Sequence, residues 1–267
     1  MPQLLIGFLL AIIVAIAAYR AHSLSRSGAL AALLEGTIIF GLGGWQWAVI
    51  LLIFFVSSSL LSRLFSKRKS KLNEKFDKGS QRDAGQVLAN GGIAALFAGL
   101  HFFLPDALWP WLAFTASLAA VNADTWATEL GVLNPTPPRL ITTSKIVEKG
   151  TSGGISPGGT LAALAGAGLV AASAQLVRPV PGFLLLFSLT TLAGLLGALF
   201  DSYLGATVQA IYICPTCNKE TERHPLHTCG TTTSLLRGFT WLNNDIVNIG
   251  CALTGALLGF VILWLMP

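Results

Sequence analysis

Charged residues are scarce in this chain: Asp, Glu, Lys and Arg make up 11% of its 267 residues, whereas 53% are hydrophobic. With a mean hydropathy of +0.68, this composition excludes an ordinary soluble globule and a disordered chain, and it indicates a polytopic membrane protein. Cysteine is also rare, and four such residues are too few for a disulfide scaffold. The net charge of +5 comes without a nucleic-acid-binding motif, so we expect no nucleic-acid partner.

The usual signals of a cleavable leader are lacking as well. The first apolar run, residues 4–19, has no basic segment before it and no small-residue cleavage site after it. We therefore expect this run to be a retained membrane span rather than a signal peptide.

Long apolar runs are abundant, and eight of them are long enough to cross, or nearly cross, the hydrocarbon core of a bilayer. They cover residues 3–19, 28–41, 45–64, 85–104, 107–121, 159–177, 183–200 and 246–266. The second run is short and glycine-rich and contains Glu35, so it is a candidate for a broken or re-entrant helix. The sequence predicts an all-α, polytopic transmembrane helix bundle that forms a single integral membrane domain over residues 1–267.

The positive charges favour one orientation of these spans. If all eight runs cross the bilayer, the connections at 20–27, 65–84, 122–158 and 201–245 lie on one side. Sixteen of the seventeen Lys and Arg residues belong to that side, counting Arg63 at the adjoining end of the third run, and Arg178 is the exception. The positive-inside tendency therefore predicts cytoplasmic polar loops and two non-cytoplasmic termini. Within these loops, residues 67–71 form a basic cluster typical of contact with anionic headgroups.

Carboxylates stand where several spans meet the polar loops. Asp124 and Glu129 follow the fifth apolar run, Asp201 follows the seventh, and Asp245 precedes the eighth. Acids are costly to keep at a membrane boundary, and on a helix Asp124 and Glu129 share one flank. Oxygen ligands of this kind suit Mg²⁺, which keeps waters while it bridges phosphates. We predict a magnesium site from these four acids, and helix capping by a solvated acid is the alternative.

Basic and glycine-rich segments near the acids indicate phosphate binding. Residues 150–160 open the sixth span with Gly, Ser and Thr, and such a segment offers backbone N–H groups and the positive end of a helix dipole. It is not a P-loop, and a flexible loop with close helix packing is the alternative. The predicted phosphate contacts are Lys78, Arg82, Arg139, Thr143, Lys145, Lys149, Thr151, Ser152, Gly153 and Gly154.

Amide side chains at the same span ends complete this set. Asn122 and Gln209 lie near the acids of the fifth and seventh runs, whereas Asn244 and Asn248 open the last span. Capping accounts for Asn244 but not for Asn248, which would lie inside the span. We predict that these amides help to bind and orient a nucleotide or an acceptor.

One polar loop, at residues 210–232, carries the pattern C-x2-C-x9-H-x-C, which matches a small zinc knuckle in ligand type and in its tight first pair. The ligands would be Cys214, Cys217, His227 and Cys229. Four protein ligands would make a closed, structural Zn²⁺ site in an inserted cytoplasmic loop. His224 is an alternative to His227, and a set of reduced surface cysteines is the alternative to a metal.

Five segments, in this order, together resemble one membrane family. They are Asn122-Ala-Asp-Thr-Trp-Ala-Thr-Glu-Leu-Gly131, Pro138-Arg-Leu-Ile-Thr-Thr143, Lys149-Gly-Thr-Ser-Gly-Gly154, Asp201-Ser-Tyr-Leu-Gly-Ala-Thr-Val-Gln209 and Asn243-Asn-Asp-Ile-Val-Asn248. They are similar to the plant and cyanobacterial phytyl-phosphate kinases and to the animal transmembrane protein 19. Residues 124–131 are also similar to the CTP-dependent polyprenol and dolichol kinases. The cysteine loop is not part of the resemblance to the plant members.

The resemblance implies an integral membrane kinase that passes a phosphoryl group from a nucleoside triphosphate, CTP by preference, to an isoprenyl monophosphate such as phytyl phosphate. For phytol, the diphosphate product would feed tocopherol synthesis. We expect catalysis from Asp124, Glu129, Lys149 and Arg82, with the lipid tail entering between spans. The alternatives are a cytidylyltransferase that makes a CDP-lipid and a membrane transporter or lipid flippase.

Overall fold

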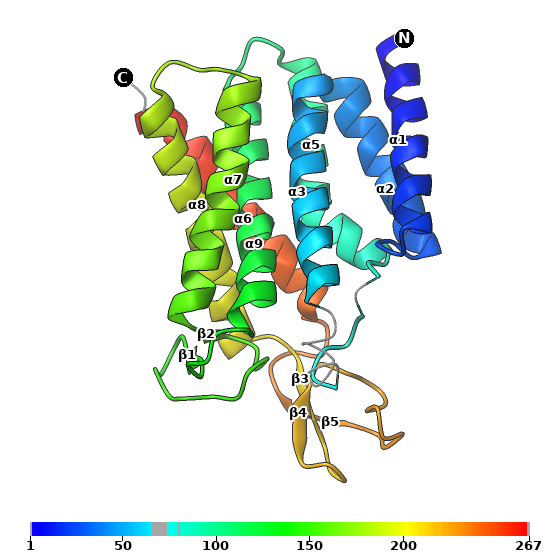
Figure 1. Cartoon of the computed structure of the whole chain (residues 1–267), viewed down its shortest axis with the longest axis vertical. Coiled ribbons are helices and arrows are strands. Elements are labelled where there is room, and N and C mark those ends of the chain that lie inside the picture. The colour runs from blue at the N-terminus through cyan, green and yellow to red at the C-terminus, as the bar shows by residue number, and fades with distance from the viewer. Residues whose placement is uncertain (1, 66–73, 80, 266–267) are drawn as a thin grey trace.

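The computed structural model describes residues 2–65, 74–79 and 81–265, so the basic cluster predicted at 67–71 lies outside the described residues. Eight α-helices dominate this part of the chain (Figure 1). They are α1 (Pro2–Arg20), α2 (Arg26–Ile38), α3 (Trp45–Leu64), α5 (Ala84–Phe103), α6 (Trp109–Gly131), α7 (Pro157–Val177), α8 (Phe183–Thr207) and α9 (Asn244–Ile262). Each helix coincides with one of the eight predicted apolar runs, which confirms the predicted helical membrane bundle.

Not all eight helices are long and apolar enough to cross a membrane by themselves. Among the described residues, α1, α3, α5, α7, α8 and the last helical stretch, Asn244–Leu265, meet both conditions. Helix α2 is too short, with only 13 residues. Helix α6 has 23 residues, but its last part is polar and includes Asn122, Asp124 and Glu129. Helix α2 shows no break at Glu35, because it continues into a π-helical turn, η1 (Ile39–Gly43), before α3 begins.

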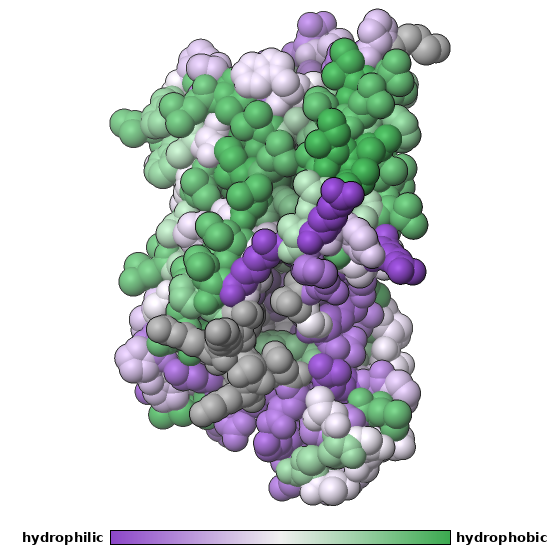
Figure 2. All heavy atoms as spheres, turned by 45° about the vertical axis from the view of Figure 1, so that its right-hand side comes forward, coloured by the Kyte–Doolittle hydropathy of each residue, from purple (hydrophilic) through white to green (hydrophobic). Residues whose placement is uncertain are grey.

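Large apolar side chains cover the outside of the bundle. Leu30, Leu176 and Leu184, for example, are 70%, 76% and 76% exposed. Figure 2 shows hydrophobic residues over most of the helical surface and hydrophilic residues gathered towards one end. Because such a surface is unfavourable in water, we assign it to contact with lipid tails.

Helix α6 is the central helix of the bundle. It packs against α3, α5, α7, α8 and α9, and its residues 110–123 are all buried. Glycines let α9 approach its backbone: a Cβ added at Gly255 would lie 2.5 Å from the Ala116 carbonyl oxygen, and one at Gly259 would lie 2.5 Å from that of Leu112. Since small residues favour close helix association in lipid, this packing holds α6 firmly in place.

The three long polar connections, which follow α3, α6 and α8, meet at the end of the bundle opposite the chain termini (Figure 1). Two small antiparallel sheets form there, one from β1 (Arg139–Leu140) and β2 (Gly154–Ile155), the other from β3 (Ile211–Cys214), β4 (Lys219–Thr221) and β5 (Ser234–Arg237). Strands this short carry little periodic signal, so the sequence did not predict them. Strand β5 lies just beyond the inserted loop predicted at 210–232 and pairs with β3. The bounds of that loop and its cytoplasmic location stay predictions.

Candidate active site

A cavity of about 680 Å³ lies among the polar connections. Segments from the 76–82 connection, α5 to α9, the loop before α7 and the β3–β4 hairpin form its walls. Its charged lining residues are Asp77, Lys78, Arg82, Asp124, Glu129, Lys149, Asp201, Glu222 and Asp245. A polar cavity of this size matches the usual range for ligand sites in proteins.

Four of the predicted acids reach this cavity from three helices. Helix α6 extends past its apolar run to Gly131, so Asp124 and Glu129 lie in its last two turns. Asp201 lies near the end of α8, and Asp245 lies in the first turn of α9. These ends converge because α6, α8 and α9 pack against one another along their length.

Asp201 is a half-buried acid of this cavity. Its Oδ2 is buried and has no hydrogen-bond partner among the described residues. The nearby carboxylates of Asp124 and Glu222 repel its charged form. Like charges in a partly buried site disfavour one another unless a cation or a proton lies between them. The acids therefore fit a divalent cation in charge and in ligand type.

Lys78 lies between two carboxylates at the edge of the cavity. Its Nζ donates to Asp83 at 3.0 Å and to Oδ2 of Asp245, while Oδ1 of Asp245 is buried without a hydrogen-bond partner in the described part of the chain. Gly85 makes room for this pair, because a Cβ there would collide with the Asp245 carboxylate. Burial lowers the pKa of Lys78, but the hydrogen bonds to Asp245 and Asp83 outweigh it and hold the pKa above its usual value, so Lys78 stays charged.

Arg82 is held more rigidly than Lys78. Its backbone N–H donates to the Ser23 carbonyl at 3.0 Å, and its carbonyl accepts from the Ser25 N–H at 3.0 Å. The guanidinium carbon lies 5.4 Å from the ring centre of Phe54 and 5.9 Å from that of Phe55. Burial lowers the pKa of Arg82 to about 10, which still leaves it charged at neutral pH. A fixed planar guanidinium at a cavity wall is well suited to bind phosphate.

The glycine-rich loop enters the cavity immediately before α7. Strand β2 lies within this loop and pairs with β1, and the Ile141 N–H donates to the Gly153 carbonyl at 3.0 Å. The Ser156 hydroxyl caps α7 by accepting from the Gly159 N–H at 3.1 Å. Lys149 precedes the loop, and its Nζ donates to the Val132 carbonyl at 3.2 Å. The loop thus presents polar groups at a helix N-terminus, where phosphate binding is favoured.

Most of the predicted site residues line this one cavity, and their roles stay predictions. They are Lys78, Arg82, Asp124, Glu129, Lys149, Thr151, Ser152, Gly153, Gly154, Asp201, Asn244, Asp245 and Asn248. Gln86 and Asn90 of α5 line it too.

Five predicted contacts are placed elsewhere. Asn122 is fully buried between helices, where Nδ2 donates to the Gly166 carbonyl at 2.8 Å and Oδ1 accepts from Ser57 and Ser58. In this position it joins α3, α6 and α7, and its role as a nucleotide contact stays a prediction. The five predicted contacts outside the cavity lining are Asn122, Arg139, Thr143, Lys145 and Gln209. Arg139, Thr143 and Lys145 lie on the exposed 139–145 segment, and Gln209 is buried behind the wall.

Sequence reasoning missed several residues that the inserted loop brings to the cavity. Tyr212, Glu222 and His224 line it from β3 and from the end of the β3–β4 hairpin. Glu222 accepts from Gln209 Nε2 at 2.9 Å and from Ser152 Oγ at 3.2 Å. Burial raises the pKa of the Glu222 carboxyl, although these two hydrogen bonds favour its charged form.

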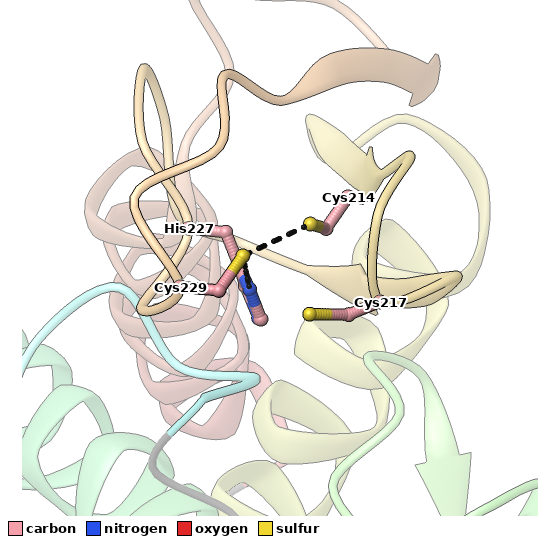
Figure 3. Close-up of side chains that lie close together, drawn as sticks. All are labelled: Cys214, Cys217, His227 and Cys229. Atoms are coloured by element: carbon pink, nitrogen blue, oxygen red, sulfur yellow. Dashed lines mark hydrogen bonds between the residues drawn. The ribbon is translucent and has the colours of Figure 1, made fainter.

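The predicted zinc ligands form a separate cluster in the inserted loop. One ligand atom from each of Cys214, Cys217, His227 and Cys229 lies within 4.8 Å of the others. Figure 3 shows the three sulfur atoms and the imidazole pointing towards one another. His224 is not in this group: it stacks on Tyr212, with ring centres 4.4 Å apart. The structure thus selects His227 over the alternative histidine.

A small apolar pocket of about 60 Å³ adjoins the polar cavity. Its lining residues all fall between Ala11 and Gly91 and come from α1, α2, η1, α3 and α5 and the connections beside them. Arg82, Gln86 and Asn90 line both spaces, so the two share a wall. Glu35, the intramembrane acid of α2, also lines the apolar pocket.

Comparison with known proteins identifies relatives over nearly the whole chain. The family model described as integral membrane protein DUF92 matches residues 9–256. Protein PGR of Arabidopsis thaliana is 35% identical over 269 residues, which cover 92% of this chain and 91% of that protein. An uncharacterized membrane protein of Methanocaldococcus jannaschii is 35% identical over 205 residues, which cover 76% of this chain and 82% of its own.

A more distant relative is Protein VTE6, chloroplastic, of Arabidopsis thaliana, which is 26% identical over 234 residues. That match covers 85% of this chain and 61% of VTE6. No solved structure matches the chain.

Proposed function

The chain belongs to the integral membrane protein family DUF92, which confirms the predicted family, and on this premise we propose that it is an isoprenyl-phosphate kinase. It would transfer the terminal phosphoryl group of CTP, or of another nucleoside triphosphate, to phytyl phosphate or a similar lipid monophosphate. One observation carries the proposal: acids, fixed cations and a glycine-rich loop meet in one polar cavity that shares a wall with an apolar pocket.

The acids would hold Mg²⁺. Asp124, Glu129 and Asp201 supply carboxylate oxygens, and Asp245 keeps one oxygen for the metal while the other binds Lys78. The buried, unpartnered Oδ2 of Asp201 supports this assignment, since Mg²⁺ prefers oxygen ligands. When bound, the metal would neutralise charge on the triphosphate.

The cations and the loop would position the phosphates. Lys149 and the Thr151–Gly154 backbone would contact the triphosphate, and Arg82 would hold the acceptor phosphate beside the apolar pocket. Asn244 and Asn248 would orient the nucleotide. An oxygen of the acceptor phosphate then attacks the terminal phosphorus, that bond forms as the bond to the leaving diphosphate breaks, and CDP departs. Because the acceptor is already an anion, the reaction needs positioning and charge neutralisation more than a base.

The apolar pocket would receive the first part of the lipid tail. A volume of about 60 Å³ holds roughly two groups of the size of water or methylene, so it would take only the first carbons of the tail. Because Arg82 lines both spaces, a phosphate bound to it lies next to this pocket. The rest of the tail would continue between spans into the bilayer.

Filling the apolar pocket should weaken binding of the lipid but not of the nucleotide. Leu52→Trp on α3 places a larger side chain in the pocket lining, and we expect the KM for geranylgeranyl phosphate to rise about tenfold. The matched control is Leu60→Trp, because Leu60 is on the same helix and 53% exposed towards lipid. Steady-state kinetics with each substrate varied in turn measures both constants. An unchanged KM for the lipid, or an equal rise for CTP, would contradict the tail assignment.

Labelled CTP distinguishes the kinase from its alternatives. Purified protein with phytyl phosphate, Mg²⁺ and γ-labelled CTP should yield labelled phytyl diphosphate, whereas α-labelled CTP should leave the lipid unlabelled. The reverse pattern would identify a cytidylyltransferase. Recovery of the lipid unchanged from both reactions would favour a transporter, although the polar residues here gather at one end of the bundle rather than at the midplane, where transporter sites usually lie.

A further inference from the structure

The inserted loop and its β3–β5 sheet together form one module, residues 210–237, and this module is part of the cavity wall. Tyr212, Glu222 and His224 line the cavity, and Tyr212 lies two residues before Cys214. Glu222 accepts a hydrogen bond from Ser152 of the glycine-rich loop. Arg237, at the other end of the module, donates to the Gly205 carbonyl at 2.7 Å and to the Ser152 carbonyl at 3.4 Å. The position of the module therefore determines the position of Ser152.

The same module also binds the connection that carries Lys78. The Glu222 N–H donates to the Lys75 carbonyl at 2.8 Å, and the Thr221 hydroxyl donates to the Glu74 carbonyl at 2.7 Å. Lys219 forms an ion pair with Glu74 at 2.6 Å. The β4 strand and its neighbours thus join two of the segments that would bind phosphate.

The module has little apolar material to stabilise this arrangement. Its strands contain four, three and four residues, and β4 and β5 are largely exposed. Leu235 and Leu236 of β5 are 44% and 45% exposed and so add little to a core. Units this small usually need a disulfide or a metal to stay folded.

The cysteine cluster fits a tetrahedral metal. Sγ of Cys214 lies 3.5 Å from Sγ of Cys229, and all four cysteines of the chain are free. Thiolates at about 2.3 Å from a tetrahedral Zn²⁺ would lie about 3.8 Å apart, close to that separation. His227 completes the set: Nδ1 lies 3.3 Å from Sγ of Cys229, and Nε2 is buried without a hydrogen-bond partner among the described residues.

We propose that Cys214, Cys217, His227 and Cys229 bind one Zn²⁺, and that this ion holds the β3–β5 module against the glycine-rich loop and the 74–79 connection. The ion is structural, since four protein ligands leave no open position. It acts through Ser152 and Glu222, so these are positioning contacts and the metal takes no part in the transfer. The effect on activity rests on the proposed kinase function, whereas metal binding does not.

Metal content tests the site directly. Elemental analysis of the intact protein in detergent should find about one zinc per chain, falling at least fivefold in Cys217→Ser and His227→Gln. Cys251→Ala and His224→Gln are the matched controls and should keep the zinc, because Cys251 is buried in α9 and His224 lies outside the cluster. Unchanged zinc in Cys217→Ser, or iron in place of zinc, would overturn the assignment.

A second measurement tests the positioning role without using activity. Stripping zinc with a chelator should expose the module to trypsin at Lys219, Arg223 or Arg237 and raise the cleavage rate at least tenfold, while the helices stay intact. If the kinase function is right, zinc loss should also lower turnover at least tenfold. A zinc-free protein with wild-type cleavage would overturn the positioning role. A zinc-bound wild type without kinase activity would refute the proposed function alone.

Discussion

Asp124→Asn is expected to lower the rate of phosphoryl transfer about 1,000-fold or more, equivalent to about 4 kcal/mol of transition-state stabilisation. Asparagine has nearly the same size as aspartate but lacks its charge, so the change weakens the magnesium site while preserving the packing of α6. Because the substitution also removes the repulsion between Asp124 and Asp201, we expect the variant to stay folded. Turnover at saturating CTP and Mg²⁺, together with the melting temperature in detergent, measures both effects.

The control for this variant is Asp106→Asn. Asp106 is exposed in the turn between α5 and α6, at the end of the bundle away from the cavity, and its loss should leave turnover unchanged. A turnover of Asp124→Asn within tenfold of the wild type would remove Asp124 from the metal site.

Arg82→Lys is expected to reduce kcat/KM for the lipid phosphate about 100-fold, with a much smaller effect on the KM for CTP. The substitution removes the planar fork that binds two phosphate oxygens. Burial lowers the pKa of Arg82 to about 10. The same burial acting on a lysine, with an ordinary pKa of about 10.4, would bring its pKa close to neutral.

The pH dependence of this variant follows from the lowered pKa of the buried lysine side chain. A lysine is charged below its pKa, so the defect should be smaller at low pH and should grow as pH rises from about 7 to 9. Arg178→Lys is the matched control, since Arg178 also lies over an aromatic ring, 5.4 Å from the centre of Trp111, but at the opposite end of the bundle. Equal losses in the two variants, or a defect independent of pH, would contradict the role of Arg82.

The helices and their shared polar end were predictable because hydrophobicity acts locally. Each apolar run needs no knowledge of the rest of the chain to be recognised as a span, and counting spans places alternate connections together. Asp124, Asp201 and Asp245 could be grouped in this way although they lie far apart in the sequence. The extension of α6 to Gly131 also agrees with the helical spacing expected for Asp124 and Glu129.

Other parts of the site depend on tertiary contacts that leave no periodic trace. Lys78 and Asp245 are 167 positions apart, and their ion pair requires both the docking of α9 and the small size of Gly85. Asn122 was predicted as a site residue because Asp124 follows it closely in the sequence, yet its side chain bonds to Ser57 of α3 and Gly166 of α7. Glu222 lies in a short, polar hairpin whose docking against Ser152 no pattern of hydrophobicity could indicate.

The apolar pocket has one further consequence, because its lining falls between residues 11 and 91 while the four predicted metal-binding acids fall between 124 and 245. Under the proposed function, the metal-binding acids and the lipid pocket would therefore be encoded by separate parts of the gene, with Arg82 lining both spaces. Selection could then reshape α1 to α5 for a longer, shorter or more saturated chain without disturbing the acids. Relatives that act on different lipids would diverge in α1 to α5, and exchanging that part between two of them would transfer the preference.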